Sequence, residues 1–151
     1  MGSIEFMDLL RSKKTAFNYE ILEKFEAGLE LLGHEVKSLR SHHGSLEGAH
    51  VIMRGGEAYV VGLNIPPYQP ANTPEGYDPE RTRKLLLTKK EIYHLSGWEN
   101  KKGFTIIPLA IFEKGKLLKI SIAIAKGKKK FDKRESIKKR DTERSIRREL
   151  S

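Results

Sequence analysis

Residues 18–31 read NYEILEKFEAGLEL, and this stretch decides the fold class. Its odd-numbered positions are largely apolar and its even-numbered positions largely polar; the apolar ones are Tyr19, Ile21, Phe25, Ala27, Leu29 and Leu31. A period of two puts alternate side chains on opposite faces, so the stretch predicts a long, half-buried β-strand. Leu22 and Glu23 interrupt the alternation, and Gly28 predicts a bulge or a sharp bend, as barrels need at their corners.

Further strands follow toward the C-terminus. Gly55-Gly56 separates residues 51–54 from 57–62, and the sequence EKGK at 113–116 separates residues 104–112 from 117–125, so two hairpins are expected. Residues 83–87 are a further candidate strand. Short helices are predicted over residues 34–43 and after Thr88, which forms a capping-box pattern with Glu91 and starts a helix that ends at Gly97. We therefore expect a mainly β fold: a small closed OB-like barrel with two or three short helices.

Positive charge is concentrated at the C-terminal end. The chain of 151 residues has a formal net charge of +9, of which residues 126–151, with 12 basic and 5 acidic residues, contribute +7. Such segregation indicates a polyanionic partner, because a cationic segment that binds phosphates releases their counterions. The alternative is a basic tail that is merely solvated.

The chain divides into three predicted parts. Residues 1–12 are expected to be a flexible lead-in, residues 13–125 an OB-like RNA-binding barrel, and residues 126–151 a basic tail. The tail lacks a continuous apolar stripe, but 135/139 and 143/147 are favourable acid-first i,i+4 pairs. We expect it to be disordered alone and helical against RNA. Within the barrel, the proline-rich loop at 66–79 predicts mobility or a binding role.

The residue pattern does not favour catalysis. The chain has no cysteine, which removes disulfides and thiolate chemistry and fits a reducing cytosol. It shows no phosphate-binding loop, nucleophile elbow or metal-ligand spacing, and no apolar run near the roughly 20 residues that span a bilayer. We expect no cofactor, no metal and no membrane association.

Chemistry suited to RNA is more evident. Basic clusters recur along the chain, and Tyr19 could stack on a base or belong to the core of its strand. Glu26 is either a solvated carboxylate or an acceptor for a base amino group. Phe131 lies among lysines and arginines with no core to join, which favours stacking on a base.

Four blocks then resemble one family. Residues 25–29 (FEAGL), 33–40 (GHEVKSLR), 78–87 (DPERTRKLLL) and 127–134 (GKKKFDKR) are similar in order and spacing to SmpB, the SsrA- or tmRNA-binding protein family. The resemblance covers about residues 13–148. It implies a bacterial cytoplasmic protein that delivers alanyl-tmRNA to stalled ribosomes for trans-translation. Its tail would occupy the decoding centre and mRNA channel.

The resemblance also implies site residues and partners. A tmRNA-facing set would contain Lys14, Tyr19, Glu26, Lys37, Ser38, Arg40, Arg81, Arg83, Lys84, Leu86 and Thr88. The set facing the ribosomal decoding centre and mRNA channel would contain Lys128, Lys129, Phe131, Asp132, Lys133 and Arg134. The partners would be the tRNA-like domain of tmRNA and the small ribosomal subunit with its rRNA, with EF-Tu and alanyl-tRNA synthetase reached indirectly through tmRNA. We expect a monomer. The alternatives are a general OB-type RNA-binding or ribosome-associated factor, or a small nuclease.

Overall fold

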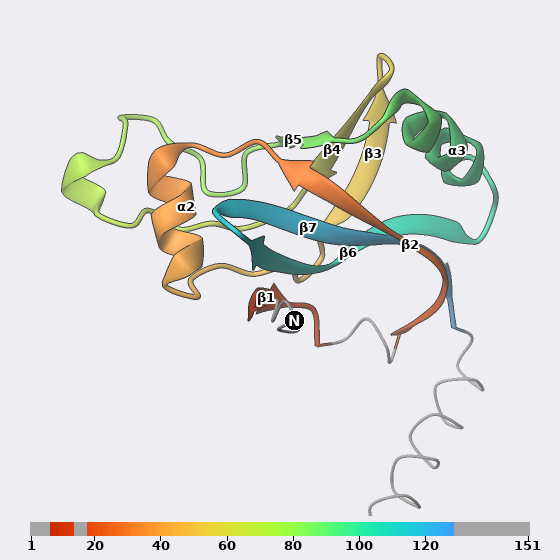
Figure 1. Cartoon of the computed structure of the whole chain (residues 1–151), viewed down its shortest axis with the longest axis horizontal. Helices are drawn as coiled ribbons and strands as arrows, with labels where there is room; N and C mark the ends of the chain where they lie inside the picture. Colours follow the sequence, from red (N-terminus) through yellow and green to blue (C-terminus); the bar gives the residue numbers. More distant parts are fainter. Residues whose placement is uncertain (1–6, 14–17, 129–151) are drawn as a thin grey trace, which may run out of the picture.

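The structure, a computed structural model, describes residues 7–13 and 18–128. Seven strands form one antiparallel sheet in the order β1-β6-β7-β2-β5-β4-β3 (Figure 1). The strands are β1 Met7–Arg11, β2 Tyr19–Leu29, β3 His50–Arg54, β4 Glu57–Val61, β5 Arg83–Leu86, β6 Phe104–Lys114 and β7 Leu117–Gly127. The helices are α2 Gly33–Arg40, α3 Lys89–Glu99 and the 3-10 helix η1 Pro70–Asn72.

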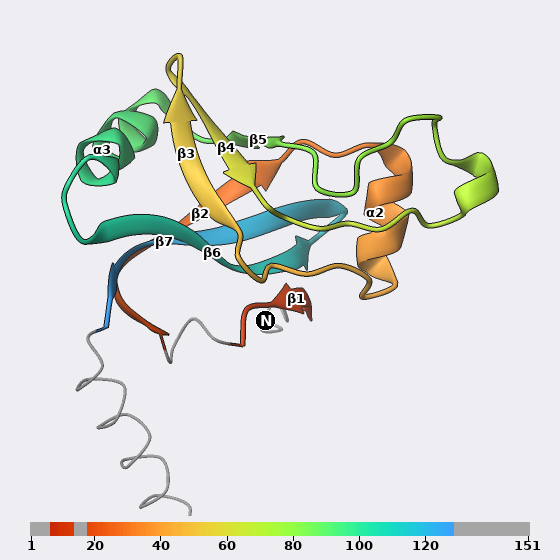
Figure 2. The same cartoon turned by 180° about the vertical axis from the view of Figure 1, so that it is seen from behind.

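The core lies on the inner face of the curled sheet. Alternate residues of β7, among them Ile120, Ile122 and Ile124, are buried and pack with Leu85 of β5. Figures 1 and 2 show α2 and α3 at opposite ends of the sheet. Each helix buries an apolar side in the same core, α2 through Leu39 and α3 through Ile92 and Leu95. The predicted hairpins, strands and capping box are confirmed.

The strand predicted over residues 18–31 is present as β2, with its irregularity in a different place. Ile21 lies opposite Ala125 and Glu23 opposite Ile124, so the extra residue of the bulge is Leu22, where the alternation breaks. Gly28 is instead the position where β2 pairs with both β7 and β5. The sequence pattern thus located the bulge better than the glycine did.

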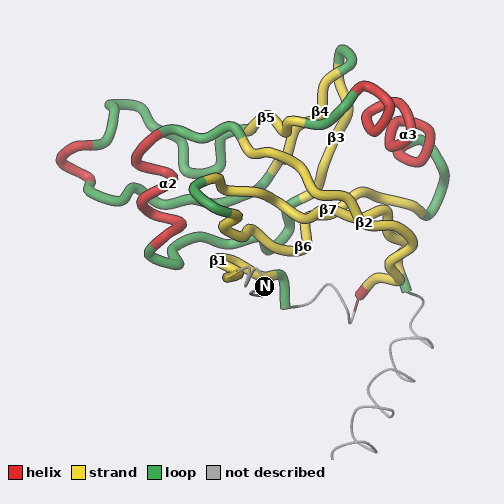
Figure 3. Tube along the Cα trace, in the orientation of Figure 1, coloured by secondary structure: helices red, strands yellow, loops and turns green. Residues whose placement is uncertain are grey.

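The prediction of a closed barrel is wrong. Within residues 7–13 and 18–128, the edge strands β1 and β3 are not neighbours in the sheet, although β3 contacts β6 as the sheet curls (Figure 3). One reason is β1, which pairs with Ala110–Glu113 and so occupies part of the edge of β6. Residues 1–12 were expected to be a flexible lead-in, whereas Leu9 and Leu10 are buried in the core and anchor β1 there.

Some boundaries also differ from the predictions. The helix predicted over residues 34–43 is α2, which spans Gly33–Arg40. Helix α3 continues through Gly97 to Glu99, because Gly97 lies on its exposed side and breaks no core contact. Strand β7 runs to Gly127, two residues past the predicted end of the barrel. In the described part of the chain, no helix has both the length and the apolar character needed to cross a membrane.

Candidate nucleic-acid interface

An open groove on the outer face of the sheet brings together four of the predicted RNA-facing residues. Its volume is about 460 Å³. The groove is lined by Glu26, Glu57, Lys84, Leu85, Leu86, Leu87, Thr88, Glu91 and Lys119, from β2, β4, β5, β7 and the start of α3. Residues far apart in the chain thus form one surface, which we call the β5 groove.

The register of three strands explains why these side chains meet. Gly28 of β2 is the direct partner of Leu86 on β5 and of Lys119 on β7. Directly opposed residues of antiparallel strands share a face, as do residues two apart in one strand. Glu26 and Lys84 therefore lie on the same outer face as Leu86 and Lys119.

Gly28 also sets how closely β5 approaches. A Cβ atom at this position would lie 3.0 Å from the Cβ of Leu86. The glycine therefore lets Leu86 lie directly over β2, where 54% of the leucine stays exposed. The centre of the groove is an exposed apolar side chain flanked by ammonium groups.

The charges of the groove are held loosely. Lys84 Nζ lies 3.5 Å from Glu57 Oε2, and Lys114 Nζ lies 3.2 Å from Glu26 Oε1, with all four side chains substantially exposed. Exposed ion pairs contribute only about 0–1 kcal/mol, so a phosphate can take an acid's place at little cost. In the part of the chain that the structure describes, Lys119 forms no ion pair, which leaves its charge available to an anionic ligand.

Thr88 borders the groove as the N-cap of α3. Its hydroxyl accepts a hydrogen bond from the Glu91 backbone N–H at 3.2 Å, and its own N–H donates to Glu91 Oε1 at 3.0 Å. The hydroxyl also lies 3.0 Å from the same carboxylate oxygen and donates to it. With its proton committed to Glu91, Thr88 can offer a ligand only a remaining lone pair.

Two members of the predicted RNA-facing set are buried and need correction. Arg83 has no exposed surface, and its guanidinium donates to Glu35 Oε2 at 2.8 Å, to Leu63 O at 2.6 Å and to Pro79 O at 2.9 Å. Ser38 is buried as well, and its hydroxyl donates to Pro66 O at 2.7 Å. In this structure neither side chain can reach RNA, so the prediction is wrong for both, and their role is internal.

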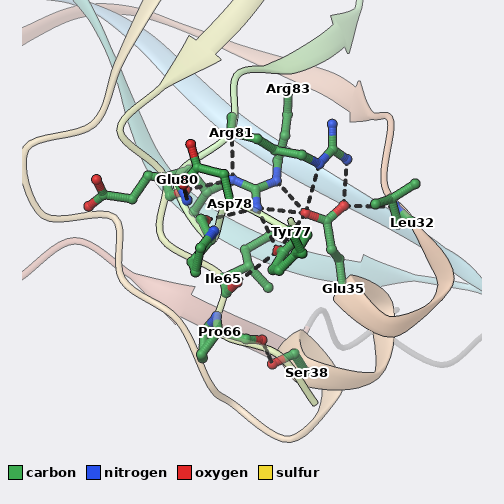
Figure 4. Close-up of polar contacts among 12 residues, drawn as sticks. Leu32, Glu35, Ser38, Ile65, Pro66, Tyr77, Asp78, Glu80, Arg81 and Arg83 are labelled. Carbon is green, nitrogen blue, oxygen red and sulfur yellow. Dashed lines mark hydrogen bonds and ion pairs between the residues drawn. The ribbon is translucent and has the colours of Figure 1, made fainter. Parts of the chain in front are cut away.

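Glu35 is the centre of that internal network, which Figure 4 shows. Its carboxylate accepts hydrogen bonds from Arg81 Nε at 3.1 Å, from Arg83 and from the Leu32 backbone N–H at 2.8 Å. The Tyr77 hydroxyl lies 2.9 Å from Glu35 Oε2 and 2.8 Å from Ile65 O, and accepts from Arg83. Arg81 is only partly exposed, so its ion pair with Glu35 competes with any contact to RNA.

The network shifts two pKa values. Burial by itself would raise the pKa of Glu35, but hydrogen bonds from Arg81, from the Leu32 backbone and from Arg83, with the charge of Arg83, lower it from 4.5 to about 2. Burial and the neighbouring Glu35 carboxylate raise the pKa of Tyr77 to about 12. Glu35 is thus a fixed anion that ties the 66–82 segment to α2.

Lys37 and Arg40 lie on the exposed side of α2. Arg40 Nε donates to Glu113 Oε1 at 3.0 Å, at the end of the β6–β7 hairpin whose Lys114 contacts Glu26. The hairpin therefore links the exposed side of α2 to the β5 groove.

Tyr19 is not brought to this surface. It lines a separate hollow of about 450 Å³ with residues that include His50 and Pro108. Seven residues separate it from Glu26 along β2, roughly 23 Å of extended chain.

Several predicted residues lie outside the described part of the chain. They are Lys14 of the tmRNA-facing set and Lys129, Phe131, Asp132, Lys133 and Arg134 of the decoding-centre set, with the predicted helical tail. Lys128 is described, and its backbone N–H donates to Asn18 O at 2.9 Å, which extends the β2–β7 pairing. Among the described residues, no group of three or more side chains is placed to hold a metal ion.

Lys119 and Glu35 were missed from the sequence. Lys119 carried a usable signal, because Leu118 and Ile120 alternate with it and place it on the outer face. Its position opposite Leu86 depends on register, which one sequence does not reveal. Glu35 stood within a quoted block, but nothing in the pattern distinguished a buried acid from a solvated one.

Comparisons with known proteins agree with one another. A family model described as "SmpB protein" matches residues 9–151. The SsrA-binding protein of Mycoplasma mycoides is 46% identical over 136 residues, which covers 90% of this chain and 92% of the relative. The SsrA-binding protein of Mesoplasma florum is 49% identical, covering 88% and 89%.

A solved structure gives the same indication. It is described as "tmRNA-SmpB: a journey to the center of the bacterial ribosome", and the present chain matches it with a TM-score of 0.68 and 37% sequence identity. The match covers 85% of this chain and 93% of that one.

Proposed function

This chain belongs to the SmpB protein family, and we propose that it binds tmRNA (SsrA) and acts in trans-translation, the rescue of stalled ribosomes. It would deliver alanyl-tmRNA to the stalled ribosome and place its C-terminal tail in the decoding centre and mRNA channel. The protein is then an adaptor without chemistry of its own, working as a monomer in the bacterial cytoplasm. EF-Tu and alanyl-tRNA synthetase would be reached only through tmRNA.

The β5 groove is the observation that carries the assignment of the RNA-binding surface. It combines an exposed leucine for ribose or base faces, the ammonium groups of Lys84 and Lys119 for phosphates, and the Glu26 carboxylate for base amino groups. These groups belong to three strands whose register fixes their spacing. A rigid, mixed surface of this kind suits a folded RNA that is recognised by shape.

The basic tail supplies the second half of the proposal. Residues 126–151 carry a net charge of +7, which suits a channel lined by rRNA. The two parts of the chain would therefore bind different partners: the folded part the tRNA-like domain, and the tail the small ribosomal subunit. Phe131 within the tail is our candidate for stacking in the decoding centre.

A competition experiment tests the first half. The full chain, bound to a labelled tRNA-like domain of tmRNA, is titrated with the unlabelled domain or with bulk tRNA at one fixed salt concentration. We expect the tRNA-like domain to compete at a concentration at least tenfold lower. Equal competition would make the chain a general OB-type RNA-binding protein instead.

Truncation tests the second half. The cut is best placed after Lys128, because β7 pairs with β2 up to Gly127 and a cut at residue 126 would damage the sheet. The truncated chain should keep its affinity for the tRNA-like domain and lose peptide tagging on stalled ribosomes. If tagging persisted, the role proposed for the tail would be wrong.

A further inference from the structure

The exposed side of helix α3 carries an aromatic residue that the β5 groove does not use. Tyr93 is 84% exposed, far more than the other large apolar side chains among the described residues. Its neighbours Ile92 and Leu95 are buried in the core, so the helix is fixed and Tyr93 is held outward.

Helix geometry sets Tyr93 one turn after two adjacent lysines. Lys89 and Lys90 precede it by four and three residues, which puts both on the same face one turn earlier. Helical side chains lean toward the N-terminus, so the Tyr93 ring lies over the turn that carries these lysines. Gly97, one turn later, has no side chain, and an added Cβ there would meet nothing within 4 Å. One side of the ring is therefore open.

The acids of α3 are turned away from this face. Glu91 closes the capping box with Thr88. Glu99 accepts hydrogen bonds from the Met53 backbone N–H at 2.6 Å and from Arg54 NH1 at 2.9 Å. The described structure shows no ion pair for Lys89 or Lys90, so the face is cationic around an exposed ring. Its charge complements an anion.

We propose that Lys89, Lys90 and Tyr93 form a second RNA contact, in which Tyr93 stacks on an unpaired base and the lysines hold the flanking phosphates. An aromatic ring beside two cations is suited to single-stranded RNA, in which each base lies beside backbone phosphates. Thr88 lines the β5 groove and also caps α3, so an RNA strand leaving the groove can continue onto this face. This contact goes beyond recognition of the tRNA-like domain and does not depend on it.

The experiment uses the full chain and a labelled, unstructured oligouridylate of eight nucleotides. Fluorescence anisotropy is measured from 50 to 200 mM salt for the native protein, Tyr93→Ala, Tyr93→Trp and Lys89→Gln/Lys90→Gln. The double variant Lys24→Gln/Lys102→Gln removes the same charge from other exposed positions and serves as the control. Because this RNA has no tRNA-like fold, failure here would leave the proposed function unaffected.

Tyr93→Ala should weaken binding by about 5- to 150-fold, the range found for loss of one stacked base, and Tyr93→Trp should retain affinity. Lys89→Gln/Lys90→Gln should flatten the slope of log K against log salt by about 1.4, at about 0.7 per phosphate contact. The control should leave the slope less changed.

Crosslinking locates the contact independently of affinity. An oligouridylate containing 4-thiouridine, irradiated with the native protein, should yield a crosslinked peptide that includes Tyr93. Tyr93→Ala binding within twofold of the native protein would overturn the proposal and leave the face to a protein partner or to solvent. Crosslinks confined to residues outside 89–97 would overturn it as well.

Discussion

Replacing Glu35 by glutamine is the most revealing perturbation of the folded part. The carboxylate has no exposed surface and compensates two arginines, of which Arg83 is itself fully buried. Glutamine keeps the volume but removes the charge, so it leaves Arg83 buried without a counter-ion. We expect the variant to fold less stably at neutral pH, with its groove still formed.

The size of the effect follows from the pKa of Glu35. Its lowering from 4.5 to about 2 corresponds to a stabilisation of about 3 kcal/mol, at about 1.4 kcal/mol per unit. That figure agrees with the loss of about 3–5 kcal/mol seen when one partner of a buried pair is removed. Typical domains are stable by only about 5–15 kcal/mol, so the change should be easily measured.

The effect should depend on pH in a defined direction. A carboxyl whose pKa is lower in the folded state stabilises the fold fully at a pH above its pKa in the unfolded chain. That contribution is lost as the pH falls through its pKa in the folded protein. The difference between native protein and Glu35→Gln should therefore be complete at pH 7, shrink below about pH 4.5 and nearly vanish near pH 2.

Urea unfolding of the full chain, followed by fluorescence, provides the measurement. Trp98 is the single tryptophan and packs against Phe104 with ring centroids 4.9 Å apart, so it reports on the core. Glu113→Gln, which removes the partly exposed partner of Arg40, is the matched control and should cost less than about 1 kcal/mol. If Glu35→Gln unfolds with a free energy within 1 kcal/mol of the native protein at pH 7, or if the difference is unchanged at pH 3, Glu35 is not the counter-ion that stabilises the buried Arg83.

Three further substitutions test neighbouring features. Thr88→Ala removes the N-cap of α3 and should destabilise the protein by about 1 kcal/mol in urea unfolding, while Thr88→Ser should restore most of the loss. Gly28→Ala places a methyl 3.0 Å from the Cβ of Leu86 and should weaken binding of the tRNA-like domain, with a stability loss of about 1–3 kcal/mol; unchanged binding would show that β5 can yield. Arg40→Ala breaks a partly exposed pair with Glu113 and should change the free energy of unfolding by less than about 1 kcal/mol, so a larger loss would indicate a structural role for the α2–hairpin contact.

The strands could be predicted because their burial repeats with a short period. In β2 and β7 alternate side chains enter the core, and that alternation is visible in the chain itself. Barrel closure could not be predicted, since it depends on which edges meet. The short β1 carries only two buried leucines, a signal too brief to distinguish from a lead-in.

The site was predictable to a similar extent. Glu26, Lys84, Leu86 and Thr88 do share one groove, but the resemblance to a family gave no means of telling a surface arginine from a buried one. Arg83 became internal because Glu35, 48 residues before it in the chain, is buried beside it. Ser38 is internal because its hydroxyl donates to Pro66 O, 28 residues later in the chain. Pairing over such separations is a property of the fold, and local patterns do not contain it.

One comparison of affinities tests whether the β5 groove holds the tRNA-like domain of tmRNA. Leu86→Ala/Lys119→Ala removes the apolar centre of the groove and the ammonium group of β7. Leu22→Ala/Lys24→Ala makes the same chemical change at exposed positions of β2 that do not line the groove. The groove variant should bind the tRNA-like domain at least tenfold more weakly than the native protein, which corresponds to a loss of roughly 1.4 kcal/mol or more of binding free energy. The control variant should bind it with an affinity within about twofold of the native protein. Equal affinities for the two variants would show that the β5 groove does not hold the tRNA-like domain.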